Sequence, residues 1–202
     1  MTVRVKICGI TRVEDARAAI EAGADMIGLN FYAKTPRYIE LDRACEIRAA
    51  VGARATLVGV FVNASRTYIK DRLRAVSLDM IQFSGDEDDG ALAGWPVPSI
   101  VTRRLKTVEG SSVRPHRGDY VLYDAFDAKL FGGTGNRISL DQLRLVDLSR
   151  AFIAGGLNPD NVAEVATLGP YAVDCASGIE SSPGVKDHEK LRSFVNNANR
   201  SR

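Results

Sequence analysis

The stretch of sequence that decides the fold is Val3-Arg4-Val5-Lys6-Ile7-Cys8-Gly9-Ile10-Thr11, which reads as a short strand followed by a glycine turn. Side chains alternate faces along a strand, so Val3, Val5 and Ile7 form an apolar face. Arg4, Lys6 and Cys8 then point the opposite way. We expect the apolar face to pack against helices and the other face to carry the chemistry.

A helix should follow this strand. Thr11 is in the position of an N-cap, and Glu14 three residues later would complete a capping box. Alanines and Ile20 supply an apolar stripe at helical spacing, which Gly23 ends. The start of the chain therefore predicts a strand, a loop and a helix in succession.

The same unit recurs along the chain. Further strands are expected over residues 24–31, 56–61, 79–83, 99–103, 120–125, 151–154 and 171–175. Helices are expected over 41–51, 65–76, 140–148, 158–168 and 188–198. Asn158 would cap the fourth of these helices, with Pro159 at its first position. Residues 86–95 allow only a brief helix, and 105–119 contain too much Gly, Ser and Pro for a clear one.

Eight strands that alternate with helices favour a parallel sheet, and eight is the number that closes into a (β/α)8 (TIM) barrel. We therefore predict an α/β fold, a single (β/α)8 barrel domain over residues 1–202, with shortened helices in the fourth and fifth units. A doubly wound open sheet is the alternative, but the turn after the first strand lacks G-x-G-x-x-G spacing. No linker or shift in composition marks a second domain.

Composition limits the partners. Of 202 residues, 45% are apolar, and the formal net charge is only +2, so nothing indicates binding to nucleic acid or a membrane surface. No apolar run reaches signal-peptide or membrane-span length, which predicts a cytoplasmic protein. Cys8, Cys45 and Cys175 lack CxxC spacing and His116 and His188 stand apart from other ligand types. We expect no disulfide framework, no metal site and no catalytic histidine.

Function in such a barrel lies at the carboxyl ends of the strands. Polar and glycine residues gather there: Cys8, residues 30–37, Asn63, Ser84, Arg103, Asp124, Gly155, Gly156, Ser177 and Gly178. The glycine pair and the segment 176–180, which could begin a short extra helix, offer main-chain N–H groups. These would bind a phosphate without a basic side chain. Tight-turn geometry alone is the other explanation of the glycine pair.

Several motifs, in order and over nearly the whole chain, resemble the phosphoribosylanthranilate isomerase family. They are VKICGIT (5–11), FYAKTPRYI (31–39), VGVFVN (58–63), YDA (123–125), GGTG (132–135), AGGLNPDNV (154–162), VDCASGIE (173–180) and PGVKD (183–187). The resemblance implies a (β/α)8 barrel enzyme of tryptophan biosynthesis. It implies the Amadori rearrangement of N-(5-phosphoribosyl)anthranilate to 1-(2-carboxyphenylamino)-1-deoxyribulose 5-phosphate, with no cofactor.

The resemblance implies that Cys8 is the general base and Asp124 the general acid. An acid must protonate the furanose ring oxygen, and a base must take the proton from C2′. Asp124 would have to be protonated or strongly hydrogen-bonded to donate. Cys8 needs a positive neighbour to react as thiolate, and Lys6 is the candidate. Without the resemblance, Cys8 could equally be a small buried apolar residue and Asp124 a capping carboxylate.

The resemblance also assigns the anthranilate carboxylate to Arg37, since a planar guanidinium can hold a carboxylate with two parallel hydrogen bonds. A solvated loop arginine is the alternative. Asp174 should face the barrel interior, and the last strand neighbours the first in a closed barrel. We therefore expect Asp174 to form an ion pair with Lys6 and so fix a charge near Cys8.

The chain departs from the family pattern in places. Gln82 keeps a supporting position, but Ser84 stands where an imidazole is common, Asn30 replaces an apolar residue, and residues 138–140 differ from the usual run. The alternatives are another phosphate-binding barrel enzyme of the tryptophan or histidine pathways, which Cys8 disfavours, and a catalytically silent sugar-phosphate-binding barrel. The expected partner is a small phosphorylated substrate, and the expected state is a monomer or homodimer.

Overall fold

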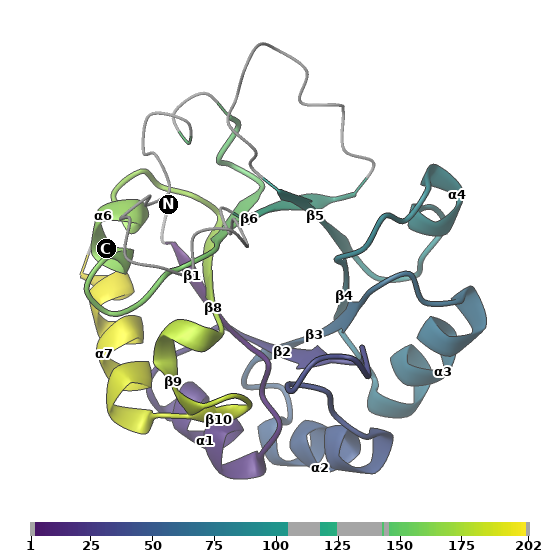
Figure 1. Ribbon diagram of the computed structural model, residues 1–202, viewed down its shortest axis with the longest axis horizontal. Helices are drawn as coiled ribbons and strands as arrows, with labels where there is room; N and C mark the ends of the chain where they lie inside the picture. Colours follow the sequence, from purple (N-terminus) through teal and green to yellow (C-terminus); the bar gives the residue numbers. More distant parts are fainter. Residues whose placement is uncertain (1–2, 105–117, 125–142, 144–145, 201–202) are drawn as a thin grey trace.

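The computed structural model describes residues 3–104, 118–124, 143 and 146–200. Eight parallel strands form a closed barrel in sequence order, and the last pairs with the first (Figure 1). The strands are β1 (Arg4–Cys8), β2 (Met26–Asn30), β3 (Thr56–Phe61), β4 (Met80–Phe83), β5 (Ser99–Arg104), β6 (Tyr120–Asp124), β7 (Ala151–Ala154) and β8 (Ala172–Cys175). The predicted (β/α)8 barrel is confirmed.

Helices lie around the outside of the ring (Figure 1). They are α1 (Val13–Glu21), α2 (Leu41–Val51), α3 (Arg66–Val76), α4 (Asp89–Leu92), α6 (Val162–Ala166) and α7 (His188–Asn199). The fourth unit has only the four residues of α4. The predictions for 105–117, for the loop 132–135, for most of the helix 140–148 and for His116 fall outside the described residues.

After β8 the chain makes one turn of 3-10 helix, η1 (Ser177–Ile179), as the sequence predicted for this segment. It continues into a two-stranded hairpin, β9 (Glu180–Ser182) and β10 (Val185–Lys186). Figure 1 places this hairpin next to α1. The last unit of the barrel therefore lies against the first one.

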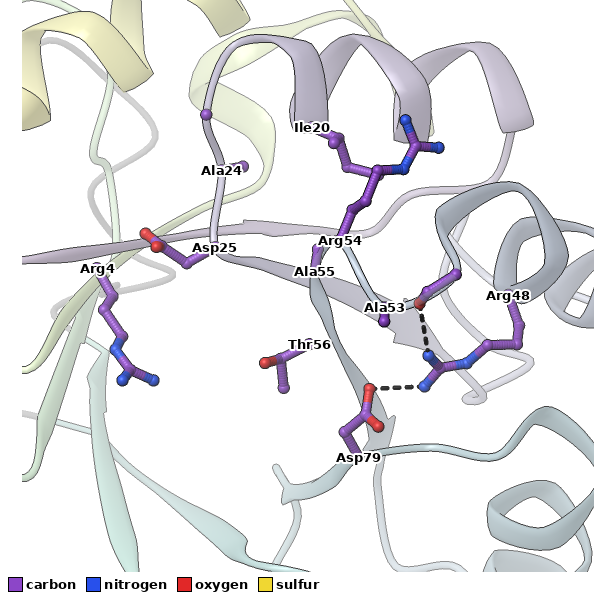
Figure 2. Close-up of a pocket in the computed structure, with 12 residues that line it drawn as sticks. Arg4, Ile20, Ala24, Asp25, Arg48, Ala53, Arg54, Ala55, Thr56 and Asp79 are labelled. Carbon is purple, nitrogen blue, oxygen red and sulfur yellow. Dashed lines mark hydrogen bonds and ion pairs between the residues drawn. The ribbon is translucent and has the colours of Figure 1, made fainter.

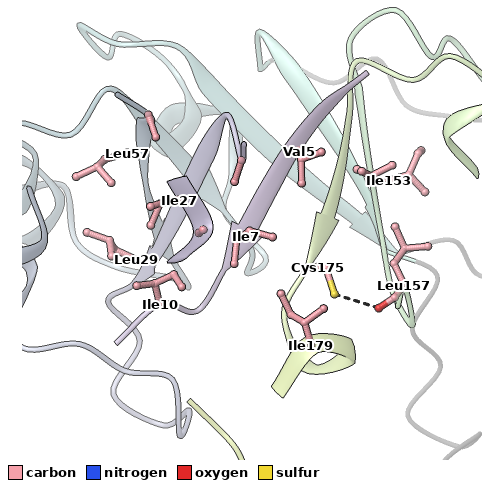
Figure 3. Packing of buried hydrophobic residues seen from close by; sticks show 14 of the residues in the cluster. Val5, Ile7, Ile10, Ile27, Leu29, Leu57, Ile153, Leu157, Cys175 and Ile179 are labelled. Atoms are coloured by element: carbon pink, nitrogen blue, oxygen red, sulfur yellow. Dashed lines mark hydrogen bonds between the residues drawn. The ribbon is translucent and has the colours of Figure 1, made fainter. Parts of the chain in front are cut away.

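The alternation predicted for the first strand separates two cores. Val5 and Ile7 are fully buried in the large core between strands and helices, part of which Figure 3 shows. A smaller cluster fills the barrel interior: Met26, Val58, Met80, Ile100, Leu122, Phe152, Ala154 and Ala172. The next inward positions toward the carboxyl ends, such as Lys6, Gln82 and Asp174, are polar. The interior of the barrel is thus apolar in its middle and polar toward the carboxyl ends of the strands.

Three aspartates brace the opposite end of the barrel. Each directly precedes a strand and accepts a main-chain hydrogen bond from the strand before it, at 2.8 Å in each case: Asp25 from Val5, Asp79 from Leu57 and Asp119 from Ser99. An open cavity of about 640 Å³ lies beside the first two (Figure 2). Arg48 and Arg54 at its wall bind main-chain carbonyls, and Arg48 also binds Asp79 at 2.6 Å. This end has a stabilising role.

Two predicted helix starts are wrong. The Thr11 hydroxyl donates to the carbonyl of Gly184 at 2.6 Å, and α1 has Arg12 as its N-cap without a side-chain cap. Asn158 accepts a hydrogen bond from the N–H of Asp160 at 2.9 Å within a turn, and α6 begins only at Val162. In both cases the expected capping side chain binds a different partner.

Candidate active site

A cavity of about 330 Å³ opens at the carboxyl ends of the strands. The predicted site residues that line it are Cys8, Arg37, Gln82, Asp124, Gly155, Gly156, Asp174 and Ser177. Lys6 and Gly178 are outside this lining. Residues that sequence reasoning did not select also line it, among them Thr102 and Leu157. Side chains from both halves of the sequence therefore meet around one space.

Cys8 ends β1 opposite Gly28 of β2. A Cβ atom on Gly28 would lie 2.9 Å from the Cys8 Sγ, closer than such atoms normally approach, and 3.1 Å from its Cα, which is a tight contact. The missing side chain of Gly28 therefore makes room for the thiol. We did not select Gly28 from sequence, although a glycine inside a strand is itself a signal of close approach.

The charge beside Cys8 is held by a buried ion pair. Lys6 is fully buried, and its Nζ donates to Asp174 Oδ1 at 3.0 Å, which confirms the expected pair. Burial disfavours the charged amine, but Asp174 and Cys8 more than offset this, so the pKa of Lys6 is raised. Lys6 therefore stays a cation within the barrel.

Lys6 is the positive neighbour expected beside Cys8, and its charge acts to lower the pKa of the thiol. Burial raises the pKa of the Cys8 thiol, and the positive charge of Lys6 opposes this only in part. Desolvation outweighs the attraction because the thiolate would lose its hydration in this wall of the barrel. The thiolate of Cys8, once formed, is therefore a stronger base than an ordinary thiolate and lies next to a fixed cation.

Asp124 ends β6 and lines the same cavity. Its register partner on β7 is Ala154, and β7 and β8 separate β6 from β1 around the ring. The carboxyl is half-buried. The barrel therefore presents a carboxyl group and a thiol from strands on different parts of the rim to one enclosed space.

The glycine pair after β7 has left-handed backbone geometry, with φ of 90° at Gly155 and 68° at Gly156. Around Gly156 there is open space for a Cβ, so backbone conformation rather than crowding requires the glycine. At Gly178 a Cβ would lie 2.0 Å from the carbonyl oxygen of Leu157. The turn of η1 therefore packs directly on the loop after β7. This contact places the main-chain N–H groups of the two segments side by side.

Arg37 is oriented by Glu180. Its Nε donates to Glu180 Oε1 at 2.8 Å and its Nη2 to Oε2 at 2.6 Å. Gly9 has a φ of 71°, and a Cβ there would lie 2.6 Å from the Arg37 Cδ, so the arginine stem lies over this glycine. Sequence reasoning did not anticipate Glu180 as the partner, because 143 residues separate the two.

Hydroxyl and amide groups occupy the wall at β4 and β5. Gln82 Nε2 donates to Ser84 Oγ at 3.0 Å, and Ser84 Oγ lies 3.0 Å from Thr102 Oγ1. The buried Gln82 Oε1 has no hydrogen-bond partner within the described part of the chain. Asn30 Oδ1 accepts the N–H of Tyr32 at 3.0 Å. Ser84 thus belongs to a cluster of polar side chains, at a position where the family that the sequence resembles commonly has an imidazole.

No helix within 3–104, 118–124 and 146–200 is long and apolar enough to cross a membrane. Within the same ranges, no group of three His, Cys, Asp or Glu side chains could hold a metal ion. His188 is not in the cavity lining and lies 2.8 Å from Asp15 Oδ1.

The chain is similar to known proteins over nearly its full length. The family model for N-(5'phosphoribosyl)anthranilate (PRA) isomerase matches residues 5–197. The N-(5'-phosphoribosyl)anthranilate isomerase of Pseudomonas fluorescens (strain Pf0-1) is 45% identical over 200 residues, which cover 96% of this chain and 97% of that protein. The phosphoribosyl anthranilate isomerase of Thermus thermophilus has a TM-score of 0.86 and 32% identity, covering 96% of this chain and 98% of that one. A phosphoribosyl anthranilate isomerase in complex with reduced 1-(o-carboxyphenylamino)-1-deoxyribulose 5-phosphate has a TM-score of 0.80 and 34% identity over 98% of both chains.

Proposed function

The chain belongs to the N-(5'-phosphoribosyl)anthranilate isomerase family, and on this premise we propose that its reaction takes place in the cavity at the carboxyl ends of the strands. The protein is an isomerase of tryptophan biosynthesis that converts an aldose derivative, N-(5-phosphoribosyl)anthranilate, into a ketose derivative. One observation supports the location: Cys8, Asp124, Arg37 and the glycine loop after β7 line a single space.

In this proposal Asp124 donates a proton to the furanose ring oxygen, and the ring opens to a Schiff base. Cys8 reacts as its thiolate, after the thiol has lost its proton to solvent: the thiolate takes the proton from C2′, which gives the enolamine. Protonation at C1′ and loss of the O2′ proton then yield the ketose. The raised pKa of Cys8 makes its thiolate a stronger base but lowers the fraction of thiolate at neutral pH. The cation of Lys6 stabilises that thiolate, and Asp174 keeps Lys6 in place.

The two ends of the substrate would bind on separate groups. We assign the phosphate to main-chain N–H groups of Gly155, Gly156, Ser177 and Gly178. The packing of η1 on the loop after β7 supports this assignment, because it brings two N–H-bearing segments to one side of the cavity. The anthranilate carboxylate would bind Arg37, whose guanidinium lines the same cavity. Gln82 would support the wall between them.

Two single substitutions test the acid and base roles. Cys8→Ala and Asp124→Asn should each lower kcat by a factor of about 10² to 10⁴, because each removes a proton-transfer group. The assay follows the loss of anthranilate-like fluorescence after addition of freshly made phosphoribosylanthranilate. Urea unfolding midpoints should stay near that of the unchanged protein. Near-normal turnover in either variant would show that the assigned group does not transfer the proton.

Domain organisation, location in the cell and oligomeric state are further parts of this proposal. We propose that the 202 residues act as one barrel domain in the cytoplasm, as a monomer or a homodimer, on a small phosphorylated substrate. The match, which covers 97% of the Pseudomonas fluorescens protein and 98% of the Thermus thermophilus chain, supports the domain assignment. Light scattering of the purified protein would measure the oligomeric state.

A further inference from the structure

Lys186 is a buried cation that the proposed mechanism does not use. Its side chain has no exposed surface, and its Nζ donates to Glu180 Oε1 at 2.9 Å and to the carbonyl of Ala176 at 2.9 Å. A buried ammonium group is costly to desolvate unless it is paired. The fold therefore accepts a charge behind the cavity wall where an apolar chain of similar length would fill the same space.

Mechanical support of the hairpin does not explain this charge. The main chain of β10 is already attached to the first unit, because the N–H of Lys186 donates to Asp15 Oδ2 at 3.1 Å. The hairpin turn is attached as well, through the hydrogen bond from Thr11 to Gly184 at 2.6 Å. The hairpin is thus attached to the first unit by groups other than the ammonium.

Glu180 lies between two cations. It accepts two hydrogen bonds from Arg37 and one from Lys186, and its carboxylate is nearly fully buried. The three side chains together carry one net positive charge. Arg37 and Glu180 alone would be neutral, and a neutral pair attracts an incoming carboxylate only weakly.

We propose that Lys186 is a positioning residue whose charge cancels that of Glu180, so that Arg37 is held in a fixed orientation and still presents one net positive charge to the substrate carboxylate. This inference rests on the proposed role of Arg37. Glu180 uses Nε and Nη2 of the guanidinium, and no hydrogen bond among the described residues uses Nη1. The Nη1 edge is the part of Arg37 that a second carboxylate can bind.

A charge series at two positions tests the proposal. The net charge of Arg37, Glu180 and Lys186 together is +1 in the unchanged protein and 0 in Lys186→Met. It is +1 again in the double variant Glu180→Gln with Lys186→Met. Two ligands are compared by calorimetry: reduced 1-(o-carboxyphenylamino)-1-deoxyribulose 5-phosphate and the same compound without its carboxylate. The readout is carboxylate selectivity, the ratio of the Kd of the second ligand to that of the first. Neither ligand reacts, so effects on Cys8 do not enter.

Lys186→Met should lower carboxylate selectivity by about tenfold, because one charge is removed near a partly desolvated anion. Affinity for the carboxylate-free ligand should change by less than about twofold. The double variant should recover most of the selectivity. It also removes the buried Glu180 carboxylate, which in Lys186→Met keeps only Arg37 as its charged partner, so the double variant can fold where the single variant does not, and a low selectivity in it would still overturn the proposal. The matched control is Lys190→Met on α7, where the lysine is mostly exposed and 3.9 Å from Asp187; its selectivity should not change.

Equal weakening of both ligands by Lys186→Met would overturn the proposal, because it would indicate a packing role. So would a double variant whose selectivity stays as low as that of Lys186→Met. Arg37→Met separates this failure from a failure of the proposed function. If Arg37→Met leaves carboxylate selectivity unchanged, Arg37 is not the carboxylate partner, and the inference about Lys186 falls with it. If Arg37→Met abolishes selectivity and Lys186→Met preserves it, only the inference is wrong.

Discussion

At the position of Cys8, the neighbouring residues decide what the thiol can do. Free cysteine is often a small buried apolar residue, and the desolvation that raises the pKa of Cys8 is what such burial produces. The ion pair of Lys6 with Asp174 distinguishes this site from an inert one, because it keeps a cation next to the sulfur. Gly28 leaves the sulfur the space it occupies.

Gly28→Ala should therefore displace the thiol and lower kcat by about tenfold or more, since small errors in the position of a reacting group are costly. The new Cβ would lie 2.9 Å from Sγ and 3.1 Å from the Cys8 Cα, so the sulfur must move and the main chain must adjust slightly. Steady-state kinetics measure the effect. Gly90→Ala in α4 is the control, because its Cβ would come no closer than 3.3 Å to Asp88 Oδ1. An unchanged kcat in Gly28→Ala would contradict the steric role.

Residue identities could be selected from sequence where a motif or a strand end marks them, as for Cys8 and Asp124, which both line the cavity. The pair of Lys6 and Asp174 was predictable because closure of the barrel makes β8 a neighbour of β1. The contacts of Glu180 and Lys186 were not predictable from sequence, because they depend on how the hairpin folds back onto the barrel. No local spacing in the sequence encodes that contact. The net effect of burial on the pKa of Cys8 was not predictable either, because it depends on the surroundings of the thiol in the folded protein.

Among the elements, strands were easier to predict than helix starts. Alternating or continuous apolar runs define the strands, and their bounds agree closely with expectation. Helix starts depend on which partner a short polar side chain binds. Thr11 binds the distant Gly184, and Asn158 forms its own turn, so neither begins a helix. The aspartates before β2, β4 and β6 likewise use their carboxylates in a contact with a neighbouring strand.

Asp79→Ala tests these inter-strand contacts. It should lower the free energy of unfolding by about 1–3 kcal/mol, because the buried N–H of Leu57 loses its acceptor. Urea unfolding measures the change. Asp79→Asn is the matched variant: it keeps an acceptor oxygen but loses the charge that faces Arg48. The half-exposed ion pair adds little by itself, so Asn should retain most of the stability. Equal losses in both variants would assign the effect to Arg48 instead.

For the molecule as a whole, charged groups join the last unit to the first two units, in addition to the pairing of β1 with β8. Asp15 of α1 receives hydrogen bonds from Arg12, from His188 and from the main chain of Lys186. Burial alone would raise the pKa of the Asp15 carboxyl, but these hydrogen bonds hold it below the ordinary value. For Glu180, burial likewise acts to raise the pKa, and Arg37 and Lys186 lower it below the usual range. Both carboxylates join segments from opposite ends of the chain.

The carboxylates of Asp15 and Glu180 should make the barrel sensitive to acid. A carboxyl group with a lowered folded pKa contributes stability that is fully present above its unfolded pKa, about 4 for Asp and Glu, and lost as pH falls through the folded value. The free energy of unfolding, measured by urea titration between about pH 6 and pH 3, should therefore fall toward the acid end. Asp15→Asn should flatten this slope, because the unfolded state then binds one proton fewer. Asp42→Asn, at an exposed position in α2, is the control and should leave the slope unchanged. A slope in Asp15→Asn as steep as in the unchanged protein would show that acid sensitivity arises elsewhere in the chain.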